Sequence, residues 1–171
     1  MRLSVAAAKQ AIAQWGGDLS EITHVVSTTC TNSANPGFDH YVVKALGLDQ
    51  SVEKVLLHGV GCSGGMAALR TAAGLAMGSS WRGRRARVLV LACEISTTFV
   101  RSELESIVGE GEVRIGVCLF SDCASAVVLG NGVDEEEEEP VLEMLGWEHR
   151  IVPETEGDLG FDVHPLGRFV V

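Results

Sequence analysis

Residues 55–70 read Val55-Leu56-Leu57-His58-Gly59-Val60-Gly61-Cys62-Ser63-Gly64-Gly65-Met66-Ala67-Ala68-Leu69-Arg70. This order predicts an apolar strand, a sharp turn and an alanine-rich helix, with Cys62 at the helix N-terminus. Backbone N–H groups at a helix N-terminus favour negative charge, and therefore favour the nucleophilic thiolate. The glycines on both sides permit the turn and leave room for a substrate to approach the sulfur.

Cys62 has two interpretations from this spacing alone. It is either a nucleophile that forms a thioester with an acyl group, or a buried structural cysteine, since free cysteine is among the most buried residue types. The turn has the shape of a hydrolase nucleophile elbow but lacks the G-x-S-x-G spacing of that motif. Both interpretations stay open at this point.

Strands and helices alternate along the whole chain. Apolar and β-branched runs predict strands at 22–29, 54–57, 87–95, 113–120, 121–130 and 141–147. Helical spacing and glycine stops predict helices at 5–15, 38–46, 62–77 and 101–107. The basic connection 78–85 is interpreted as a solvated loop rather than a phosphate site. This alternation predicts an α/β fold with a parallel or mixed sheet.

Composition excludes several classes of protein. The chain has 171 residues, of which 46% are hydrophobic, and this is enough to form a core. Its formal net charge of −10 argues against a general nucleic-acid binder, which needs a basic face to neutralise phosphates. No apolar run is long enough to span a bilayer, and the N-terminus lacks the architecture of a signal peptide. Part of the negative charge lies in the run Asp134–Glu139, which is expected to form a loop.

The cysteines argue against both a disulfide framework and a metal site. Their number is odd, and no two of them show C-x-x-C spacing. Cys118 and Cys123 lie in an apolar region and are expected to be buried. A reducing, cytoplasmic location is the simplest interpretation. The five cysteines are Cys30, Cys62, Cys93, Cys118 and Cys123.

Several ordered motifs resemble those of the type III polyketide synthases, the chalcone-synthase-like branch of the thiolase fold, and fungal members in particular. The motifs are TCTNSANPG at 29–37, GVGCSGG at 59–65, ACEIS at 92–96, LFSDCASA at 119–126 and IVPETEGDLGFDV at 151–163. The resemblance implies a thiolase-like N-terminal-half domain at 1–132, an acidic loop at 133–140 and the start of a C-terminal half at 141–171. The expected fold is therefore an incomplete thiolase-like fold.

The resemblance also implies roles for individual residues. Cys62 corresponds to the catalytic cysteine that holds the growing polyketide, and Phe120 to a phenylalanine between the coenzyme A tunnel and the cavity. Glu94 corresponds to an acid near the active site, and Asn35 to a position at a dimer interface. From the residues alone, Phe120 would be a core aromatic side chain. The positions that the resemblance assigns to the cavity wall are Cys30, Thr31 and Ser96.

The implied reaction is the condensation of an acyl-coenzyme A starter with malonyl-coenzyme A, in a homodimer without metal or bound organic cofactor. The histidine and asparagine of the family mechanism are expected beyond Val171, and the basic residues that hold coenzyme A before Met1, so none is assigned here. A non-catalytic remnant or partner-binding fragment is therefore the alternative. A third hypothesis is another thiolase-fold condensing enzyme, such as a ketoacyl synthase.

Overall fold

The computed structural model describes residues 1–111, 113, 116–133, 140–155, 157–158, 162–163 and 169–170. The chain divides into two units, Met1–Ile95 with Asp122–Glu139, and Ser96–Ser121 with Pro140–Val171. The acidic run expected to form a loop lies outside the described residues. The domain boundaries expected from the sequence, 1–132, 133–140 and 141–171, stay a prediction.

The first unit is built on a four-stranded sheet with the order β2-β1-β3-β4. Three strands run parallel, and β4 joins β3 in the antiparallel direction. This confirms the predicted mixed sheet. The strands are β1 (His24–Thr29), β2 (Glu53–His58), β3 (Arg87–Glu94) and β4 (Cys123–Gly130).

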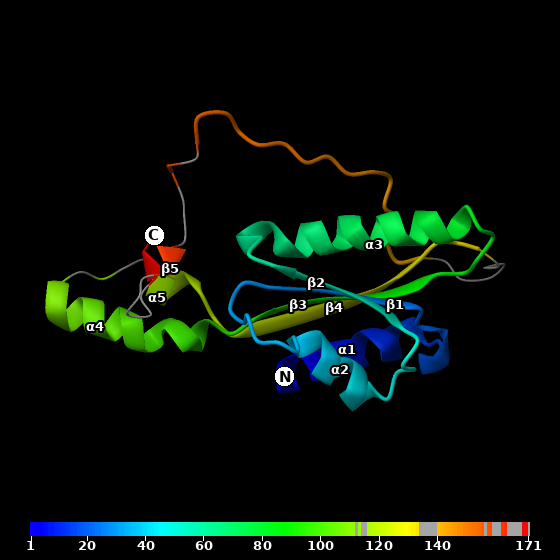
Figure 1. Cartoon of the computed structure of the whole chain (residues 1–171), viewed down its shortest axis with the longest axis horizontal. Coiled ribbons are helices and arrows are strands. Elements are labelled where there is room, and N and C mark those ends of the chain that lie inside the picture. Colours follow the sequence, from blue (N-terminus) through cyan, green and yellow to red (C-terminus); the bar gives the residue numbers. More distant parts are fainter. Residues whose placement is uncertain are drawn as a thin grey trace. The chain divides into compact units, whose positions relative to one another are not determined.

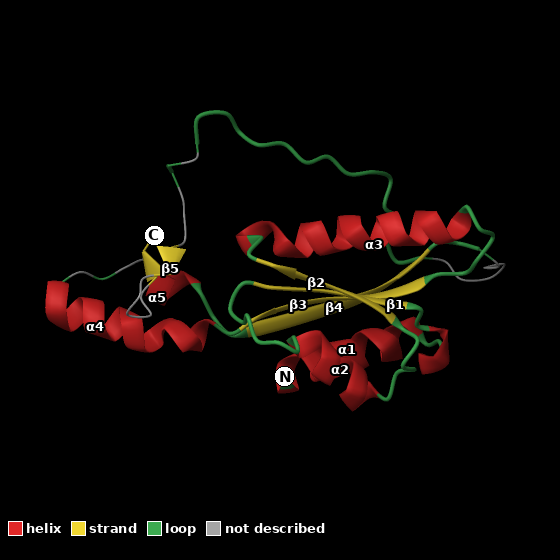
Figure 2. Ribbon diagram, viewed as in Figure 1, coloured by secondary structure: helices red, strands yellow, loops and turns green. Residues whose placement is uncertain are grey.

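Helices cover both faces of this sheet (Figure 1). Helices α1 (Arg2–Trp15) and α2 (Phe38–Leu46) lie on one face, and α3 (Gly64–Ser80) lies on the other. Gly16 and Gly47 end the first two helices in the left-handed conformation that glycine adopts readily. Figure 2 shows the same layers by secondary structure. A short helix, η1 (Leu19–Glu21), leads into β1.

Alternating side chains of the buried strands divide the core into two clusters. Val25 packs toward α1 and α2, whereas its neighbour Val26 packs toward α3, because successive strand residues point to opposite faces. Helix α3 presents a stripe of small side chains to the sheet, which allows close packing. The buried members of this stripe are Gly64, Ala68, Ala72, Ala73 and Ala76.

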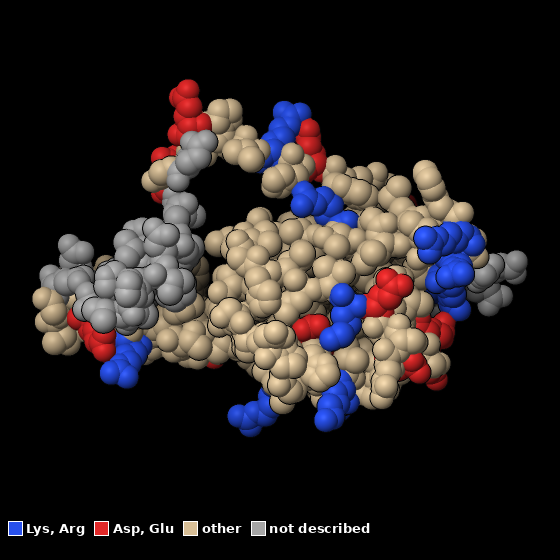
Figure 3. Space-filling model, viewed as in Figure 1, with Lys and Arg blue, Asp and Glu red and all other residues tan. Residues whose placement is uncertain are grey.

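The opposite side of α3 carries exposed apolar side chains. Met66 is 70% exposed, Met77 is 55% exposed, and Trp81 directly after the helix is 92% exposed. Figure 3 shows that much of the visible surface of the first unit is neither acidic nor basic. The sequence predicted a solvated loop at 78–85. Helix α3 continues to Ser80, so the loop begins at Trp81, and its residues 81–85 are exposed as predicted.

One polar side chain joins the end of α3 to the sheet. Asn131 Nδ2 donates hydrogen bonds to Ser80 Oγ and to the Arg84 carbonyl oxygen, each at 2.9 Å. Its Oδ1 accepts a hydrogen bond from the Ala86 backbone N–H at 3.1 Å. Asn131 therefore supplies hydrogen-bond partners to backbone groups of the connection between α3 and β3, which has no regular secondary structure to pair them.

The described residues of the second unit form two short helical segments, a longer helix and a pair of short strands. They are η3 (Ser96–Phe99), α4 (Val100–Glu110), α5 (Gly116–Leu119), β5 (Asp162–Val163) and β6 (Phe169–Val170). Strands β5 and β6 pair in the antiparallel direction. Helix α4 confirms the helix predicted at 101–107.

Two predicted strands are wrong. The described part of 113–120 contains helix α5, and the N–H of Phe120, directly after the helix, donates to the Gly116 carbonyl oxygen at 3.0 Å. Periodicity does not distinguish a short apolar strand from a short helix. Residues 141–147 form no strand, and Val141 is 97% exposed, so this apolar segment has no sheet on which to pack.

The burial predicted for two cysteines is also wrong. Cys118 lies in α5 and Cys123 begins β4, and both are exposed. Strand β4 alternates exposed and partly buried residues, so its apolar composition does not mean burial on both faces. Among the described residues, no helix is both long and apolar enough to cross a membrane.

Candidate functional site

The turn between β2 and α3 presents Cys62 to solvent. After β2 ends at His58, Gly59 and Gly61 adopt φ values of 68° and 70°, which disfavour any residue with a Cβ. Cys62 lies in the short helix η2 (Gly61–Ser63), and α3 begins at Gly64. The cysteine is exposed, so the structural interpretation of it as a buried hydrophobe is wrong. The helix begins two residues later than predicted.

Gly64 allows the start of α3 to lie directly against strand β1. A Cβ at this position would come within 2.6 Å of Thr28 Oγ1, which is shorter than any ordinary contact. Gly65 has no atom within 4 Å of the corresponding position. The close approach at Gly64 therefore places the Cys62 turn beside the end of β1. The contact between Gly64 and Thr28 could not be predicted from the sequence, because a glycine at a helix start gives no sign of what it contacts.

The carboxyl ends of the parallel strands bring Cys30 and Glu94 together, beside the turn that carries Cys62. Cys30 directly follows β1, Glu94 ends β3, and the Cys30 backbone N–H donates to both Glu94 carboxylate oxygens at 2.9 and 3.1 Å. Ligand sites of open α/β sheets lie at this edge of the strands. Residues 64 positions apart in the chain thus meet beside the turn that carries Cys62.

Threonine hydroxyls complete this junction. Thr31 Oγ1 accepts a hydrogen bond from the Ile95 backbone N–H at 2.9 Å and lies 3.2 Å from Thr29 Oγ1. Thr29 Oγ1 donates to Glu94 Oε2 at 3.4 Å. Thr31 therefore fixes the loop after β1 onto the end of β3. The sequence analysis missed Thr29, which has no feature to distinguish it from other strand threonines.

The Cys30 thiol is held in its protonated form. Partial desolvation, a hydrogen bond with Glu94 and the nearby charges of Glu94 and Cys62 raise the pKa of Cys30 to about 11. The residue as a whole is exposed, as Cys62 is.

Ser96 and Phe120 belong to the second unit. Ser96 begins η3 and is partly buried. Phe120 follows α5 and is 46% exposed, so its interpretation as a core aromatic residue is wrong. Their predicted roles in the cavity wall and at its entrance stay predictions.

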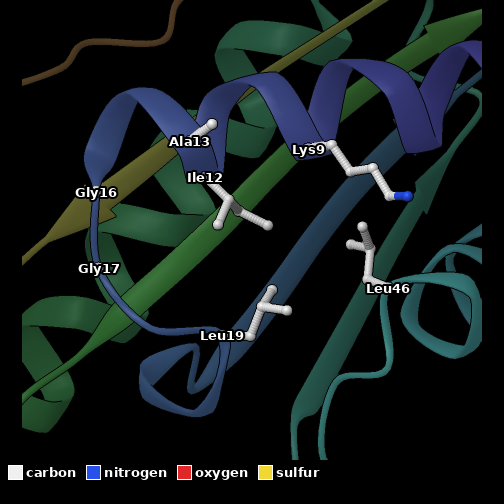
Figure 4. A pocket seen from close by; sticks show the side chains of 7 residues that line it. All are labelled: Lys9, Ile12, Ala13, Gly16, Gly17, Leu19 and Leu46. Atoms are coloured by element: carbon white, nitrogen blue, oxygen red, sulfur yellow. The ribbon is translucent and has the colours of Figure 1, made fainter.

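A surface hollow of about 370 Å³ lies away from these residues (Figure 4). It lies between the C-terminal parts of α1 and α2, and η1. None of the predicted site residues lines it, and we assign it no role. Across the part of the chain that the structure describes, no group of three or more His, Cys, Asp or Glu side chains could hold a metal ion. The residues lining the hollow are Lys9, Ile12, Ala13, Gly16, Gly17, Leu19 and Leu46.

Comparison with curated proteins identifies fungal relatives. The chain is 46% identical over 167 residues to the acylalkylpyrone synthase csyB of Aspergillus oryzae, covering 96% of this chain and 42% of the relative. It is 40% identical over 164 residues to the type III polyketide synthase pspB of Penicillium soppii, covering 93% of this chain and 41% of the relative. The chain thus spans less than half the length of the curated relatives it matches.

Solved structures show the same fold. A type III pentaketide synthase from Neurospora crassa matches with a TM-score of 0.92 at 59% identity, over 99% of this chain and 45% of the other. CsyB in complex with CoA-SH matches with a TM-score of 0.93 at 44% identity, over 99% of this chain and 46% of the other. These matches confirm the predicted α/β, thiolase-like fold class.

The family model for the N-terminal domain of chalcone and stilbene synthases matches residues 1–133. This range includes the turn that carries Cys62 and the junction between Cys30 and Glu94. The chain therefore belongs to the chalcone and stilbene synthase family.

Proposed function

We propose that this chain carries the nucleophile-bearing part of a type III polyketide synthase, and that Cys62 accepts the acyl group. The observation that supports this most directly is the exposed thiol in the glycine turn between β2 and α3. The relatives named above are an acylalkylpyrone synthase and a pentaketide synthase, and one was solved with CoA-SH. Acyl-coenzyme A is accordingly the proposed substrate.

In the proposed loading step, the Cys62 thiolate attacks the thioester carbonyl of acyl-coenzyme A. A new S–C bond forms, the bond from the carbonyl to the coenzyme A sulfur breaks, and coenzyme A leaves as its thiolate. Malonyl-coenzyme A then supplies two-carbon units by decarboxylative condensation with the Cys62-bound acyl group. Neither step calls for a metal or a bound organic cofactor.

The residues at the carboxyl edge of the sheet would form one wall beside the growing chain. Cys30 and Thr31 follow β1, and their backbone is tied to Glu94 and Ile95 at the end of β3. Side chains fixed in this way can set the shape of a cavity without taking part in bond formation. Ser96 and Phe120 are proposed to contribute from the second unit, with Phe120 at the entrance for coenzyme A.

The assembly and location of the protein complete the proposal. We propose a homodimer, as expected from the family resemblance of the segment around Asn35. We also propose a cytoplasmic location. All five cysteines are free in the structure, which fits a reducing compartment.

Acyl loading tests the proposal directly. The chain is incubated with hexanoyl-coenzyme A, and its intact mass and tryptic peptides are measured. We expect one hexanoyl group on the tryptic peptide 55–70, which contains Cys62 as its only cysteine. The Cys62→Ala variant should take up none, whereas Cys123→Ala should load like the parent because it retains Cys62.

Equal loading of the parent chain and Cys62→Ala would contradict the proposal, as would loading of Cys123 in preference to Cys62. Circular dichroism of each variant verifies that the fold is retained. Loading is a better readout than polyketide formation here, because the chain spans less than half of its relatives.

A further inference from the structure

Two thiols of different character lie at the same edge of the sheet. Cys62 lies in the turn after β2, and Cys30 directly follows the neighbouring strand β1. The register pairs Thr29 with His58, so the two chain segments leave the sheet side by side. Both cysteines are exposed and free.

The close approach at Gly64 brings the two segments nearer still. Gly64 lies against Thr28, two residues before Cys30, and Cys62 comes two residues before Gly64. The charge of Cys62 is also one of the smaller causes that raise the pKa of the Cys30 thiol.

Cys30 is anchored at this edge of the sheet by Glu94. Its backbone N–H donates to both oxygens of Glu94, and its thiol is hydrogen-bonded to the same carboxylate. Because its raised pKa keeps Cys30 protonated, this thiol reacts slowly with peroxide, since the thiolate is the reactive form. Cys30 is therefore not expected to be the thiol that peroxide oxidises first.

We propose that Cys30 is a resolving cysteine that captures oxidised Cys62 in a reversible disulfide. The pair would protect Cys62 from irreversible oxidation under peroxide stress. This inference concerns the redox chemistry of the two thiols and does not depend on acyl transfer.

The chemistry has two balanced steps with hydrogen peroxide as the oxidant. The Cys62 thiolate attacks one peroxide oxygen, an S–O bond forms, the O–O bond breaks, and hydroxide leaves, so that Cys62 becomes a sulfenic acid. The sulfur of Cys30 then attacks the sulfur of Cys62. An S–S bond forms, the S–O bond breaks, and the departing hydroxide takes the Cys30 proton and leaves as water.

Peptide mapping distinguishes this pair from other thiols. Trypsin releases Cys30 in peptide 10–44 and Cys62 in peptide 55–70, each with a single cysteine. The chain is treated with one equivalent of hydrogen peroxide, alkylated and digested without reductant. We expect a cross-linked pair of these peptides, two hydrogens lighter than their sum, that dithiothreitol restores to two free thiols.

Removal of Cys30 should abolish this protection. The variants Cys30→Ser and Cys30→Ala and the parent chain are therefore also treated with an excess of hydrogen peroxide, because a sulfinic acid consumes two equivalents. In both variants we expect loss of the cross-link and conversion of Cys62 to sulfinic acid, which dithiothreitol does not reverse, whereas the parent chain should give the disulfide. Cys118→Ser serves as the matched control and should retain the cross-link, because Cys118 belongs to the other unit.

Two results would overturn the proposal. One is irreversible oxidation of Cys62 to the same extent with and without Cys30. The other is a cross-link from peptide 55–70 to peptide 115–150, which contains Cys118 and Cys123, in place of peptide 10–44. Since a disulfide needs Cα atoms within about 7 Å, the cross-link also reports how closely the two segments approach.

Discussion

Substitution of Gly64 by alanine tests the close approach that sets the position of the Cys62 turn. The added Cβ would lie 2.6 Å from Thr28 Oγ1, against an optimal separation of roughly 3.5 Å. Thr28 is only 3% exposed and lies on a strand with neighbours on both sides, so it has little room to move. Overpacking of this kind costs about 1–3 kcal/mol.

The neighbouring glycine provides a matched control in the same helix turn. Gly65→Ala meets no atom within 4 Å, and the loss of glycine's freedom in the unfolded chain should stabilise the fold by about 0.5–1 kcal/mol. The same gain partly offsets the clash in Gly64→Ala. The free energies of unfolding of the two variants should therefore differ by about 1–3 kcal/mol in urea titrations followed by circular dichroism.

A double variant makes the test specific. Thr28→Ala removes the hydroxyl that the new methyl group would meet, so Gly64→Ala should cost less in that background than in the parent chain. The coupling between the two sites is read from a double-mutant cycle. Equal stability of Gly64→Ala and Gly65→Ala, or additive effects in the cycle, would refute the close approach.

Three further predictions concern stability, thiol reactivity and association. Asn131→Ala should lower the free energy of unfolding by about 2–4 kcal/mol, since its side chain makes five hydrogen bonds to described residues, three of them at 3.1 Å or less. Asn32→Ala, whose side chain accepts a hydrogen bond from the exposed Ala34 N–H, should cost less than about 1 kcal/mol; equal costs in urea titrations would contradict the role of Asn131. Because its pKa is raised to about 11, Cys30 in peptide 10–44 should be alkylated by iodoacetamide increasingly fast from pH 8 to pH 11, and a rate that levels off near pH 9 would contradict this. Met66→Ser combined with Trp81→Ser should reduce concentration-dependent self-association in sedimentation velocity runs, because both side chains are largely exposed; unchanged association, as expected for Asn32→Ala, would argue against this surface.

The sequence predicts the first unit well because its signals are local and agree with each other. The run 88–93 is continuously apolar and forms the middle of β3, which is buried over most of its length. The helix predicted at 38–46 has the observed limits, since Gly47 ends it in a left-handed conformation. Hydrophobic pattern and glycine position point to the same structure in each case.

The second unit was predicted less well for a physical reason. A segment such as 113–120 is apolar and β-branched, but a strand forms only where another strand offers hydrogen bonds. The described residues there form α5 instead. Local propensity is weak enough for the surroundings to override it.

The turn that carries Cys62 could be predicted from the sequence, because the glycines around it mark a turn into a helix. The roles of the candidate site residues stay predictions, and their contacts could not be predicted. The contact between Cys30 and Glu94 depends on how β1 and β3 align, and no local pattern records that alignment. Knowledge of the family supplied the residues that local pattern left undecided.

Hydrogen bonds of threonine hydroxyls stabilise the pairing of β1 with β3 at both of its ends. Thr23 Oγ1 donates to the Arg87 carbonyl oxygen at 3.0 Å near one end, and Thr31 Oγ1 receives the Ile95 N–H at the other. A shift of the β1–β3 register by a single residue would break both hydrogen bonds and turn every side chain of the shifted strand to the opposite face of the sheet. The spacing of β1 and β3 at this edge of the sheet is thus set by the scaffold, so the side chains that follow the two strands can be exchanged without realigning the strands.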